Sequence, residues 1–424
     1  MFKGSVSMKV WGALGALSLL AGCGAIANDE GAPAQVRQAV TSAANPIAAG
    51  RYHVLVVRNG SIWGWGSDAY GQLGDGTTGD ANNNRATPIQ LQVLDTQGAP
   101  VSFTSVAAAE THSLALDTTG KVWAFGYNNV GQLGLGTYQQ SLVPVQVPSL
   151  SNVVAISAHT GSAFSMALDS SGQVWTWGYN NTGQLGDGTI DRYDRKLSPV
   201  KVQVQTTDGS VSYLNGVVAI SAGLDHCLAI RSDGTLWGWG SNAGGMLYTS
   251  TSVTALYKAT QLPLPAGTTA VEVVAGYTHS LVLLSDGTVW AGGFNTWGYL
   301  GSPTNPGRVT YSNGTTLSGV TRLEVGKTHS AAMISTGTVA WGDNQFGQLG
   351  TGSKVSTSYA VPTLYVPGGS YPALGEDFSA ALDGNGDVWT WGSNVHGRLG
   401  RLIPGVAAAD QLMSLDPTPR KVTF

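Results

Sequence analysis

Five of the seven histidines in this 424-residue chain share one sequence context, which makes them the first candidates for chemistry. Each opens a short segment of the kind His112-Ser113-Leu114-Ala115-Leu116. The set is His53, His112, His226, His279 and His329. Imidazoles gathered around a common centre could bind a transition metal. Because Phe164 and Phe378 occupy the same position in two further copies, we expect structural histidines satisfied within each copy, and neither a metal site nor a cofactor.

Two other motifs resemble ligand-binding loops but lack essential parts. The string 383–387 reads DGNGD, as in a calcium loop, but Val388 stands where Gly is needed and Asn394 where a bidentate Glu belongs. We expect a hairpin turn there. The glycines of Gly183 to Gly188 are not followed by a helix, so the dipole that binds phosphate is missing. No Ser-His-Asp, paired-carboxylate or metalloenzyme pattern has suitable spacing, and we expect no catalytic residue.

The elements that position these residues come from a repeat. The phrase VWTWGYNNTGQLGDGT at 174–189 has relatives throughout the chain, and the Gly that closes W-x-W-G recurs seven times at intervals of 49 to 62 residues. These glycines are Gly66, Gly126, Gly178, Gly240, Gly293, Gly342 and Gly392. Each unit reads P-x-x-V, an apolar run, H-S-L-A-L, W-x-W-G and N-x-x-G-Q-L-G. Short alternating segments joined by Asn-Gly and Asp-Gly turns predict an all-β chain of about four strands per repeat.

Alternation within the phrase predicts how the sheets pack. Residues two apart in a strand share a face, so Trp63 and Trp65 point one way and Gly64 the other. The residue between the two aromatic positions is small in every copy, and eleven of thirteen tryptophans belong to the phrase. A bulky face can therefore nest on the small face of the next sheet. Seven such sheets in a ring predict a seven-bladed β-propeller over residues 45–424.

The end of the chain suggests how the ring closes. The first copy starts near Ala44 without a P-x-x-V piece, whereas Pro419 to Val422 is a P-x-x-V piece with no repeat after it. We expect the C-terminal segment to complete the first blade, so that the last strand closes the ring.

The N-terminus has the features of an export signal. Lys3 and Lys9 precede and flank an apolar run, Val10 to Leu20, that is too short to span a bilayer of roughly 30 Å. It ends in Leu20-Ala21-Gly22-Cys23, which resembles the bacterial lipobox. This predicts a signal peptide over 1–22, a lipid on Cys23 and a flexible tether over 23–44. An ordinary secretory signal is the alternative. By the same resemblance, Gly24 favours the outer membrane.

Taken together, H-S-L-A-L and V-W-x-W-G-x-N-x-x-G-Q-L-G in seven copies resemble the regulator of chromosome condensation repeat family. The resemblance covers roughly residues 45–424 and implies a seven-bladed β-propeller. The family founder is a nuclear nucleotide-exchange factor for a small GTPase. Bacterial relatives are secreted, and one inhibits β-lactamases by pressing a propeller face onto the enzyme. Since one fold serves several functions, the resemblance does not fix the activity.

Recognition residues are expected at variable positions within the repeated turns. One class lies just before the His position and another just before G-Q-L-G, and these turns resemble the ones with which the β-lactamase inhibitor meets its partner. The candidates for partner binding are Tyr52, Tyr70, Tyr277, Trp297, Phe346, Glu376, Asp377 and His396. Aromatic anchors beside mixed charge are typical of interface hot spots. Ordinary variation of exposed loops is the alternative reading. Two longer loops, 90–106 and 201–218, look like extended hairpins that either contact a partner or are tolerated insertions.

The charge and composition of the chain limit the classes of partner that it is expected to bind. The net charge is −4, charged residues are 11% of the chain, and no basic patch or stripe is visible, so we expect no nucleic-acid partner. The expected function is a non-enzymatic, lipid-anchored binding scaffold of the bacterial cell envelope, an outer-membrane lipoprotein and a monomer, that presents loops to a protein or glycan. The alternatives are an envelope enzyme or enzyme subunit with a site at the central channel, and a propeller-type enzyme inhibitor. Nucleotide exchange is disfavoured because the signal peptide would remove the chain from the cytoplasm.

Overall fold

The computed structural model describes residues 45–78, 84–190, 195–364 and 371–424, all within one compact unit, Arg37–Phe424. The predicted signal peptide, Cys23 and the tether up to residue 44 lie outside the described residues and remain predictions. Among the described residues, no helix has the length and apolar character needed to cross a membrane.

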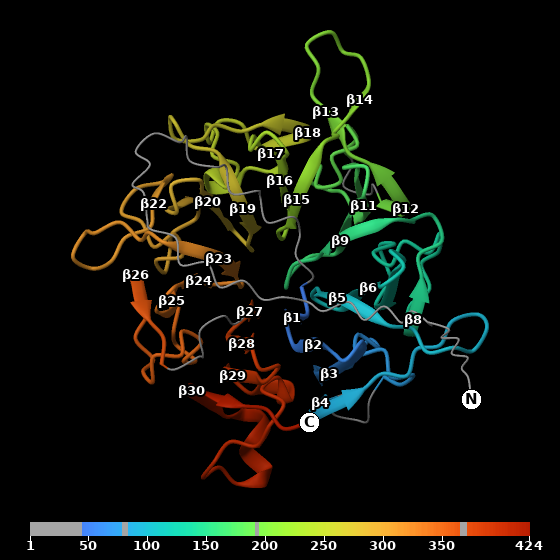
Figure 1. Cartoon of the computed structure of the whole chain (residues 1–424), viewed down its shortest axis with the longest axis vertical. Helices are drawn as coiled ribbons and strands as arrows, with labels where there is room; N and C mark the ends of the chain where they lie inside the picture. Colours follow the sequence, from blue (N-terminus) through green and yellow to red (C-terminus); the bar gives the residue numbers. More distant parts are fainter. Residues whose placement is uncertain (1–44, 79–83, 191–194, 365–370) are drawn as a thin grey trace, which may run out of the picture. The chain divides into compact units, whose positions relative to one another are not determined.

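Seven antiparallel sheets follow one another along the chain and are arranged in a ring (Figure 1). Blades one to three comprise β1 (Ile47–Ala49), β2 (His53–Arg58), β3 (Ser61–Ser67) and β4 (Asn84–Gln90); β5 (Phe103–Ala108), β6 (His112–Asp117), β7 (Val122–Gly126) and β8 (Ser141–Gln146); β9 (Val153–Ser157), β10 (Phe164–Asp169), β11 (Val174–Tyr179) and β12 (Arg195–Lys201).

Blades four and five comprise β15 (Val217–Ala222), β16 (His226–Arg231), β17 (Leu236–Ser241) and β18 (Ala255–Gln261); β19 (Ala270–Ala275), β20 (His279–Leu284), β21 (Val289–Gly293) and β22 (Gly307–Arg308). Blades six and seven comprise β23 (Val320–Val325), β24 (His329–Ile334), β25 (Gly337–Gly342) and β26 (Thr357–Pro362); β27 (Tyr371–Leu374), β28 (Phe378–Leu382), β29 (Val388–Ser393) and β30 (Leu415–Lys421). Within the described residues, three short 3₁₀ helices lie in loops: η1 (Ala243–Gly245), η2 (Val395–Gly397) and η3 (Ala408–Met413).

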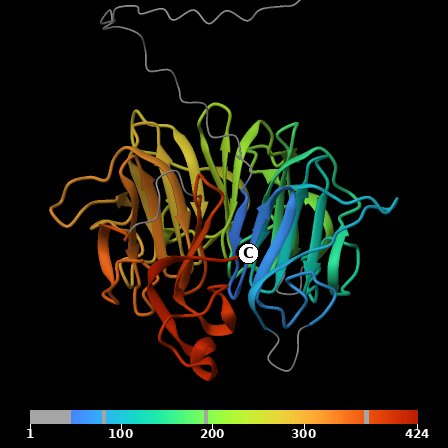
Figure 2. The same ribbon diagram turned by 60° about the horizontal axis from the view of Figure 1, so that its bottom comes forward.

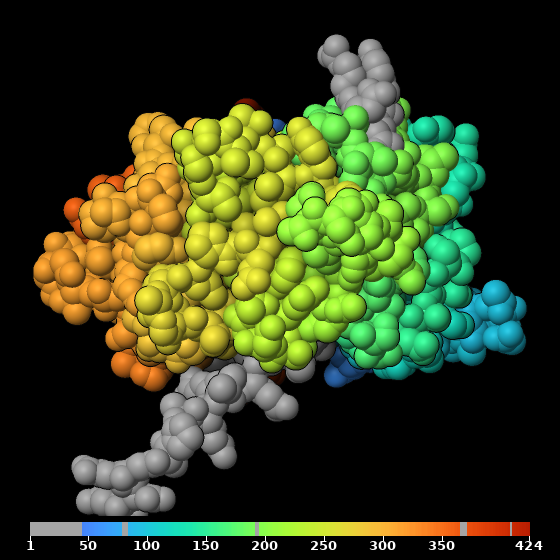
Figure 3. All heavy atoms as spheres, turned by 90° about the horizontal axis from the view of Figure 1, so that it is seen from above, coloured from blue at the N-terminus to red at the C-terminus, as the bar shows by residue number. Residues whose placement is uncertain are grey.

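The first strand of each blade lies nearest the centre of the ring and the fourth lies outermost (Figure 1). The predicted seven-bladed β-propeller is therefore confirmed. Blade four carries one addition, the hairpin of β13 (Gln203–Val204) and β14 (Ser212–Tyr213), which pairs in parallel with β18. This confirms the extended hairpin predicted within 201–218. The side view in Figure 3 shows blades four and five in contact along the side of the ring.

The predicted nesting of bulky on small faces is also observed. Trp65 is fully buried among apolar residues of blade seven, and Trp177 is fully buried among those of blade two. Each of these bulky faces thus packs on the preceding blade around the ring, with blade seven preceding blade one. The indole Nε1 of Trp65 donates a hydrogen bond to the carbonyl of Arg398 at 2.9 Å, which satisfies the indole inside the interface.

Close approach at these interfaces explains the last glycine of the G-Q-L-G motif. Gly134 and Gly400 both have positive φ, and a Cβ on either would lie within 2.8 Å of an indole nitrogen, of Trp177 and Trp65 respectively. A side chain there would displace the tryptophan of the following blade. The glycine is therefore required by packing, and its positive φ is the special backbone angle predicted for this repeated turn.

The assignment of the C-terminal segment to the first blade is wrong. β30 pairs with β29, with Trp389 opposite Lys421, so it is the outer strand of blade seven, and blade one has its own outer strand in β4. The P-x-x-V piece ends each blade instead of beginning it. The C-terminus still reaches blade one, because the ring of Phe424 lies 5.4 Å from that of Trp63 and beneath the guanidinium of Arg58 at 3.8 Å.

The five repeated histidines are structural, but their Nε2 hydrogen bonds run between blades and not within each one as predicted. Each Nε2 bonds to the Ser Oγ of the next blade at 2.8–2.9 Å. The pairs are His53–Ser113, His112–Ser165, His226–Ser280, His279–Ser330 and His329–Ser379. Ser113 Oγ also donates to the carbonyl of Gln72, so it accepts its hydrogen bond from the His53 Nε2–H. Burial lowers the pKa of all five rings to about 3, which keeps them neutral.

The two blades with Phe at the His position show the complementary arrangement. Phe164 packs with Cys227 of blade four, and Phe378 packs with Val54 of blade one. Cys227 and Val54 stand where the other blades have the accepting Ser. Each of the five repeated histidines therefore faces a hydroxyl, and each Phe faces a side chain that needs no such partner.

The aspartate-rich string of blade seven forms the predicted hairpin turn between β28 and β29. Asp383 Oδ1 accepts hydrogen bonds from the backbone of Asn385 and Asp387 at 2.9 and 3.0 Å. Its Oδ2 accepts one from the indole of Trp389 at 2.9 Å. The carboxylate is used to tie the turn to the first tryptophan of the phrase.

Candidate partner-binding face

Loops of two classes meet at the same end of the ring. Because consecutive strands are antiparallel, the loop from first to second strand and the loop from third to fourth strand emerge on one side of every blade (Figure 2). We call this side the loop face. It contains all eight predicted partner-binding residues: Tyr52, Tyr277, Glu376 and Asp377 in the first class, and Tyr70, Trp297, Phe346 and His396 in the second.

Ion pairs join four blades on the loop face. Arg51 of blade one bonds to Glu376 of blade seven, Nε to Oε2 at 3.0 Å, and pairs with Glu110 of blade two. Lys327 of blade six pairs with the other oxygen of Glu376. Burial opposes ionisation of Glu376, but hydrogen bonds from Lys327 and Arg51 outweigh it and hold its pKa below the usual value. Glu376 is thus a charged anchor that fixes the loops around it.

A second cluster adjoins this network at the junction of blades seven and one. Asp377 pairs with the guanidinium of Arg398, a residue only 2% exposed. Tyr52 lies 5.1 Å from the ring of His396, edge on, with the guanidiniums of Arg51 and Arg398 4.8 and 5.2 Å from its centroid. The structure therefore brings four of the predicted residues together, and all four are half-buried: Tyr52, Glu376, Asp377 and His396. Their side chains are preorganised by contacts inside the protein.

Three other predicted residues project from the loop face. Tyr70, Trp297 and Phe346 are 40%, 49% and 40% exposed, and they belong to blades one, five and six. The backbone N–H of Tyr70 donates to Gln72 Oε1 at 2.9 Å, and that of Phe346 to Gln348 Oε1 at 3.0 Å. The repeated Gln thereby fixes the turns that display Tyr70 and Phe346, whereas Tyr299 stands at the Gln position after Trp297.

Tyr277 links the inner and outer parts of this face. Its ring is half-buried, lies 6.5 Å from that of His159 and has Lys327 Nζ 5.3 Å from its centroid. It therefore joins blade five to blades three and six, and it is less available to a partner than Trp297.

The sequence prediction missed several charged residues. Arg398 replaces Gln in the motif of blade seven, and this departure from the repeat was a usable signal. Glu272, Arg322 and Glu324 lie on first strands, where the other blades carry small or apolar residues. His159 occupies the position that holds Gly or Ala in the other blades. Aligning the copies column by column would have exposed all of them.

The two longer loops lie on the opposite side of the ring from the loop face. Both connect a fourth strand to the next first strand, at 90–106 and 201–218. The first holds a single bridge between Leu94 and Pro100, and the second holds the β13–β14 hairpin. Leu94 and Val211 are 55% and 63% exposed. Any contact made by these loops would therefore be separate from one made by the predicted aromatics.

Sequence comparison relates the chain to one repeat family. Patterns described as the regulator of chromosome condensation (RCC1) repeat match residues 59–116, 119–168 and 171–230, and further stretches at 103–132, 153–184, 217–245, 270–296 and 373–398. The ultraviolet-B receptor UVR8 of Arabidopsis thaliana is 27% identical over 363 residues, 84% of this chain and 78% of the receptor. Protein RCC2 of Mus musculus is 30% identical over 71% of this chain and 59% of its own length. The human E3 ubiquitin-protein ligase HERC2 is 29% identical over 81% of this chain, which spans only 7% of the ligase.

Solved structures agree with the fold. Human WBSCR16 superposes with a TM-score of 0.68 at 24% identity, covering 80% of this chain and 86% of the other. Prp20p of Saccharomyces cerevisiae, whose binding to Gsp1p and histones was studied with its structure, gives 0.64 at 23% identity, covering 79% and 81%. At this identity the likeness speaks for the fold alone.

Proposed function

The chain belongs to the regulator of chromosome condensation (RCC1) repeat family, and from that premise we propose that it is a non-enzymatic scaffold that binds a protein partner on the loop face. The observation that carries the proposal is the convergence of eight variable residues, three of them exposed aromatics, on that one face. The repeat fixes the ring, whereas these eight positions within the repeated turns vary from copy to copy.

Exposed aromatics on fixed turns are suited to anchor a partner. Burying Trp297 and Phe346 in an interface removes large apolar areas from water, each worth about 2 kcal/mol or more. The Gln-locked turn already holds the backbone of Phe346 in place, so little conformational entropy is lost on binding. Rigid presentation is thus the proposed mechanism, and it requires no conformational change.

The ion-pair network has a supporting role in this proposal. Half-buried pairs such as Arg51–Glu376 contribute little to affinity by themselves, because water screens them and each is already satisfied internally. They hold loops of four blades in register, so that the aromatics keep a constant spacing. They also give the centre of the face a mixed charge, which selects against a partner of strongly single-signed charge.

A matched pair of variants tests the face. The full chain would be used to capture partners from a native envelope extract, alongside Tyr70→Ala/Trp297→Ala/Phe346→Ala on the loop face and Leu94→Ala/Val211→Ala/Tyr213→Ala on the opposite side. We expect the first variant to lose the captured protein by about tenfold or more and the second to retain it. The reverse pattern would place recognition on the longer loops and overturn the proposal. Melting curves of both variants would verify folding.

We further propose that the scaffold is held outside the cytoplasm by a lipid on Cys23, as an outer-membrane lipoprotein. The support is the Leu20-Ala21-Gly22-Cys23 pattern after an apolar run. Mass spectrometry of the membrane fraction should find a lipidated peptide that begins at Cys23, and Cys23→Ala should release the protein. An unmodified soluble protein in the parent strain would contradict the anchor without affecting the binding face.

A further inference from the structure

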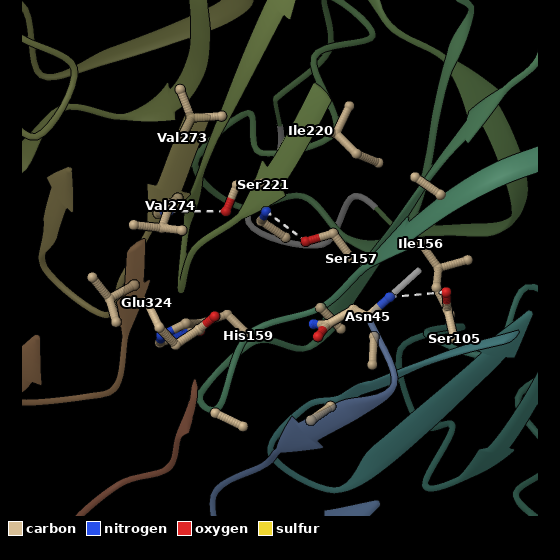
Figure 4. Close-up of a pocket in the computed structure, with 18 of the residues that line it drawn as sticks. Asn45, Ser105, Ile156, Ser157, His159, Ile220, Ser221, Val273, Val274 and Glu324 are labelled. Atoms are coloured by element: carbon tan, nitrogen blue, oxygen red, sulfur yellow. Dashed lines mark hydrogen bonds between the residues drawn. The ribbon is translucent and has the colours of Figure 1, made fainter. Parts of the chain in front are cut away.

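One buried carboxylate oxygen lacks a hydrogen-bond partner, and it lies in the loop that follows β3 in blade one. It belongs to Asp68, which is 0% exposed. Within the described residues, Asp68 Oδ2 is the one fully buried carboxylate oxygen in this condition. The carboxylates of the central pocket (Figure 4) differ, because Glu272 Oε2 accepts the N–H of Leu323 at 2.9 Å and Arg322 lines the same wall. The unpartnered oxygen of Asp68 therefore requires a physical explanation of its own.

The other six blades have Asn where blade one has Asp68. These residues are Asn128, Asn180, Asn242, Asn295, Asn344 and Asn394. In all seven blades, Oδ1 of this side chain accepts the backbone N–H of the Leu five residues later, at 2.9–3.0 Å. In the six Asn blades, Nδ2 also donates to backbone carbonyls later in the same loop. Asp68 thus places an acceptor where the repeat requires a donor.

Blade three has the same loop with Asn in place of Asp, and it shows which contact is affected. Asn180 Nδ2 donates to Asp187 Oδ1 at 3.3 Å, and Asp187 pairs with Lys196 at 3.3 Å. In blade one, Asp75 occupies the place of Asp187 and pairs with Arg85 at 2.7 Å. An amide therefore meets the carboxylate in blade three, whereas a second carboxyl meets it in blade one.

The charges around Asp68 favour its neutral form. Burial raises the pKa of Asp68 to about 7, and the neighbouring Asp75 acts in the same direction. A backbone N–H and the charge of Arg85 lower this pKa by less, and Arg85 is already paired with Asp75. On the side of blade seven, His396 Nδ1 lies 3.1 Å from Asn84 Oδ1, and burial lowers the pKa of that imidazole, so it adds no positive charge.

We propose that a proton on Asp68 Oδ2 holds the blade-one loop closed, and that loss of this proton to water releases the segment 75–78 from the turn 68–74. The Oδ2–H donates to Asp75, as the Asn180 amide donates to Asp187 in blade three. Ionisation removes that hydrogen bond and leaves two like charges in a buried place. The N–H of Gly76 bonds to the carbonyl of Leu142 in blade two at 2.9 Å, so release of the segment also breaks a contact between blades.

This device acts on the loop face through Tyr70, which lies in the same turn. The ring of Tyr70 packs 4.6 Å from that of Tyr127 in blade two, so its position depends on how the blade-one loop sits against that blade. The closed loop at low pH therefore presents Tyr70 in a fixed position, and the released loop does not. The effect on partner binding rests on the proposed function, but the device itself needs no partner.

Hydrogen exchange of the Gly76 amide in the full chain tests the device. In the released loop the carboxyl of Asp68 regains its ordinary pKa of about 3.9, so release becomes easier as the pH rises and levels off above the folded pKa. After division by the intrinsic exchange rate, we expect the Gly76 rate to rise by about tenfold or more between pH 5 and pH 7. The Gly188 amide of blade three, which bonds to the carbonyl of Tyr257 at 3.0 Å, is the matched reference and should rise less than about twofold. Equal profiles at Gly76 and Gly188 would overturn the proposal.

Two reciprocal variants assign the effect to one atom. Asp68→Asn gives blade one the donor of the other six blades and should abolish the rise at Gly76, whereas Asn180→Asp should create such a rise at Gly188. Asp410→Asn removes the same charge from an exposed position and should leave both profiles unchanged. If Asn180→Asp does not fold, Asp68→Asn carries the test, and a rise that persists in it would refute the role of this proton.

A bound cation is the competing explanation for the unpartnered oxygen. The exchange profiles would therefore be repeated with 1 mM Ca²⁺ and with a chelator. We expect no difference between them, because a proton and not a metal ion holds the loop. Suppression of the Gly76 rise by Ca²⁺ would show that the two carboxyl groups hold a cation and would overturn the proposal. Either failure concerns blade one alone and leaves the proposed scaffold function untouched.

Discussion

Five blade interfaces contain a buried His–Ser hydrogen bond, and two contain a Phe against an apolar partner. At His329–Ser379 the imidazole Nε2–H donates to the hydroxyl, and the hydroxyl donates a hydrogen bond to the carbonyl of Gln348 at 2.7 Å. At the junction of blades seven and one, Phe378 meets Val54 with no polar atom on either side chain. Both solutions fill the same place in the ring. The difference shows that the two halves of an interface are chosen as a pair.

The physical reason is the cost of a half-made contact. A buried imidazole without a partner loses its hydration and gains nothing in return, which costs about 1–3 kcal/mol. An interface that pairs the imidazole Nε2–H with a hydroxyl and a fully apolar interface both avoid the loss of that donor's hydrogen bond. Mixed pairs should therefore be unstable in either direction, and the predictions below test this from the largest effect to the smallest.

Removing residues 415–424 should have the largest effect. The deletion takes away β30, the buried Val422 and the ring of Phe424 that covers Trp63, so the apolar junction of blades seven and one loses part of its packing. We expect the free energy of unfolding to fall by about 5 kcal/mol or more. Urea denaturation would measure this free energy. Met413→Ala is the control, because the Met413 side chain is 87% exposed in the same blade and its removal should leave the free energy of unfolding unchanged. An unchanged transition would show that the junction does not depend on this strand.

Phe378→His should destabilise by about 3 kcal/mol, because it buries an imidazole opposite Val54. Adding Val54→Ser should recover at least half of the loss. The carbonyl of Arg398 already accepts a hydrogen bond from the Trp65 indole, and the new hydroxyl would donate a second one to it. At the neighbouring interface the carbonyl of Gln348 accepts both kinds of hydrogen bond, from the Trp391 indole and from the Ser379 hydroxyl. A double-mutant cycle by urea denaturation measures the coupling. Additive effects would mean that pairing across the interface is not the cause.

The opposite exchange should cost less. His329→Phe leaves Ser379 without its donor but still bonded to Gln348, so we expect a loss of about 1–2 kcal/mol. Ser379→Cys added to it reproduces the Phe164–Cys227 arrangement and should restore most of that stability. Calorimetric melting of the four proteins checks this. If Ser379→Cys alone were harmless, the His–Ser bond would contribute nothing to stability.

The smallest expected difference between the two kinds of interface is in how the free energy of unfolding depends on pH. Each buried His has a folded pKa of about 3, far below its unfolded value near 6.5, so its contribution is full above pH 6.5 and is lost as the pH falls toward 3. Glu272, Glu324 and Asp68, with folded pKa values of about 7, 8 and 7, act in the opposite direction and lose their contribution as the pH rises through those values. Stability should therefore be greatest near pH 6.5.

The double variant His329→Phe/Ser379→Cys sharpens this test. Because it has one titrating imidazole fewer, its stability should fall less steeply between pH 6 and pH 4.5, by about 1.4 kcal/mol per pH unit. Urea denaturation at several pH values measures the slope. Identical slopes for parent and variant would mean that His329 is not the buried neutral group that the structure indicates.

Much of the fold was predictable because the order of large and small residues within the repeat indicates how its sheets pack. Trp65 and Gly64 alternate in a strand, and this alone assigns a bulky and a small face to each sheet. Seven copies then determine the number of blades, and antiparallel pairing places Tyr52 and Tyr70 at one end of the ring. The sequence by itself also located the variable turn positions, and their role in recognition remains a prediction.

The start of each blade, the partner of each His and the polar lining of the channel were decided only by the tertiary structure. A periodic sequence can be cut at any point, so hydrogen bonding alone shows that β30 belongs to blade seven. His53 and Ser113 are far apart in sequence and meet because consecutive blades face one another. Glu272, Glu324 and His159 are single departures from three different copies, and only closure of the ring brings them into one pocket.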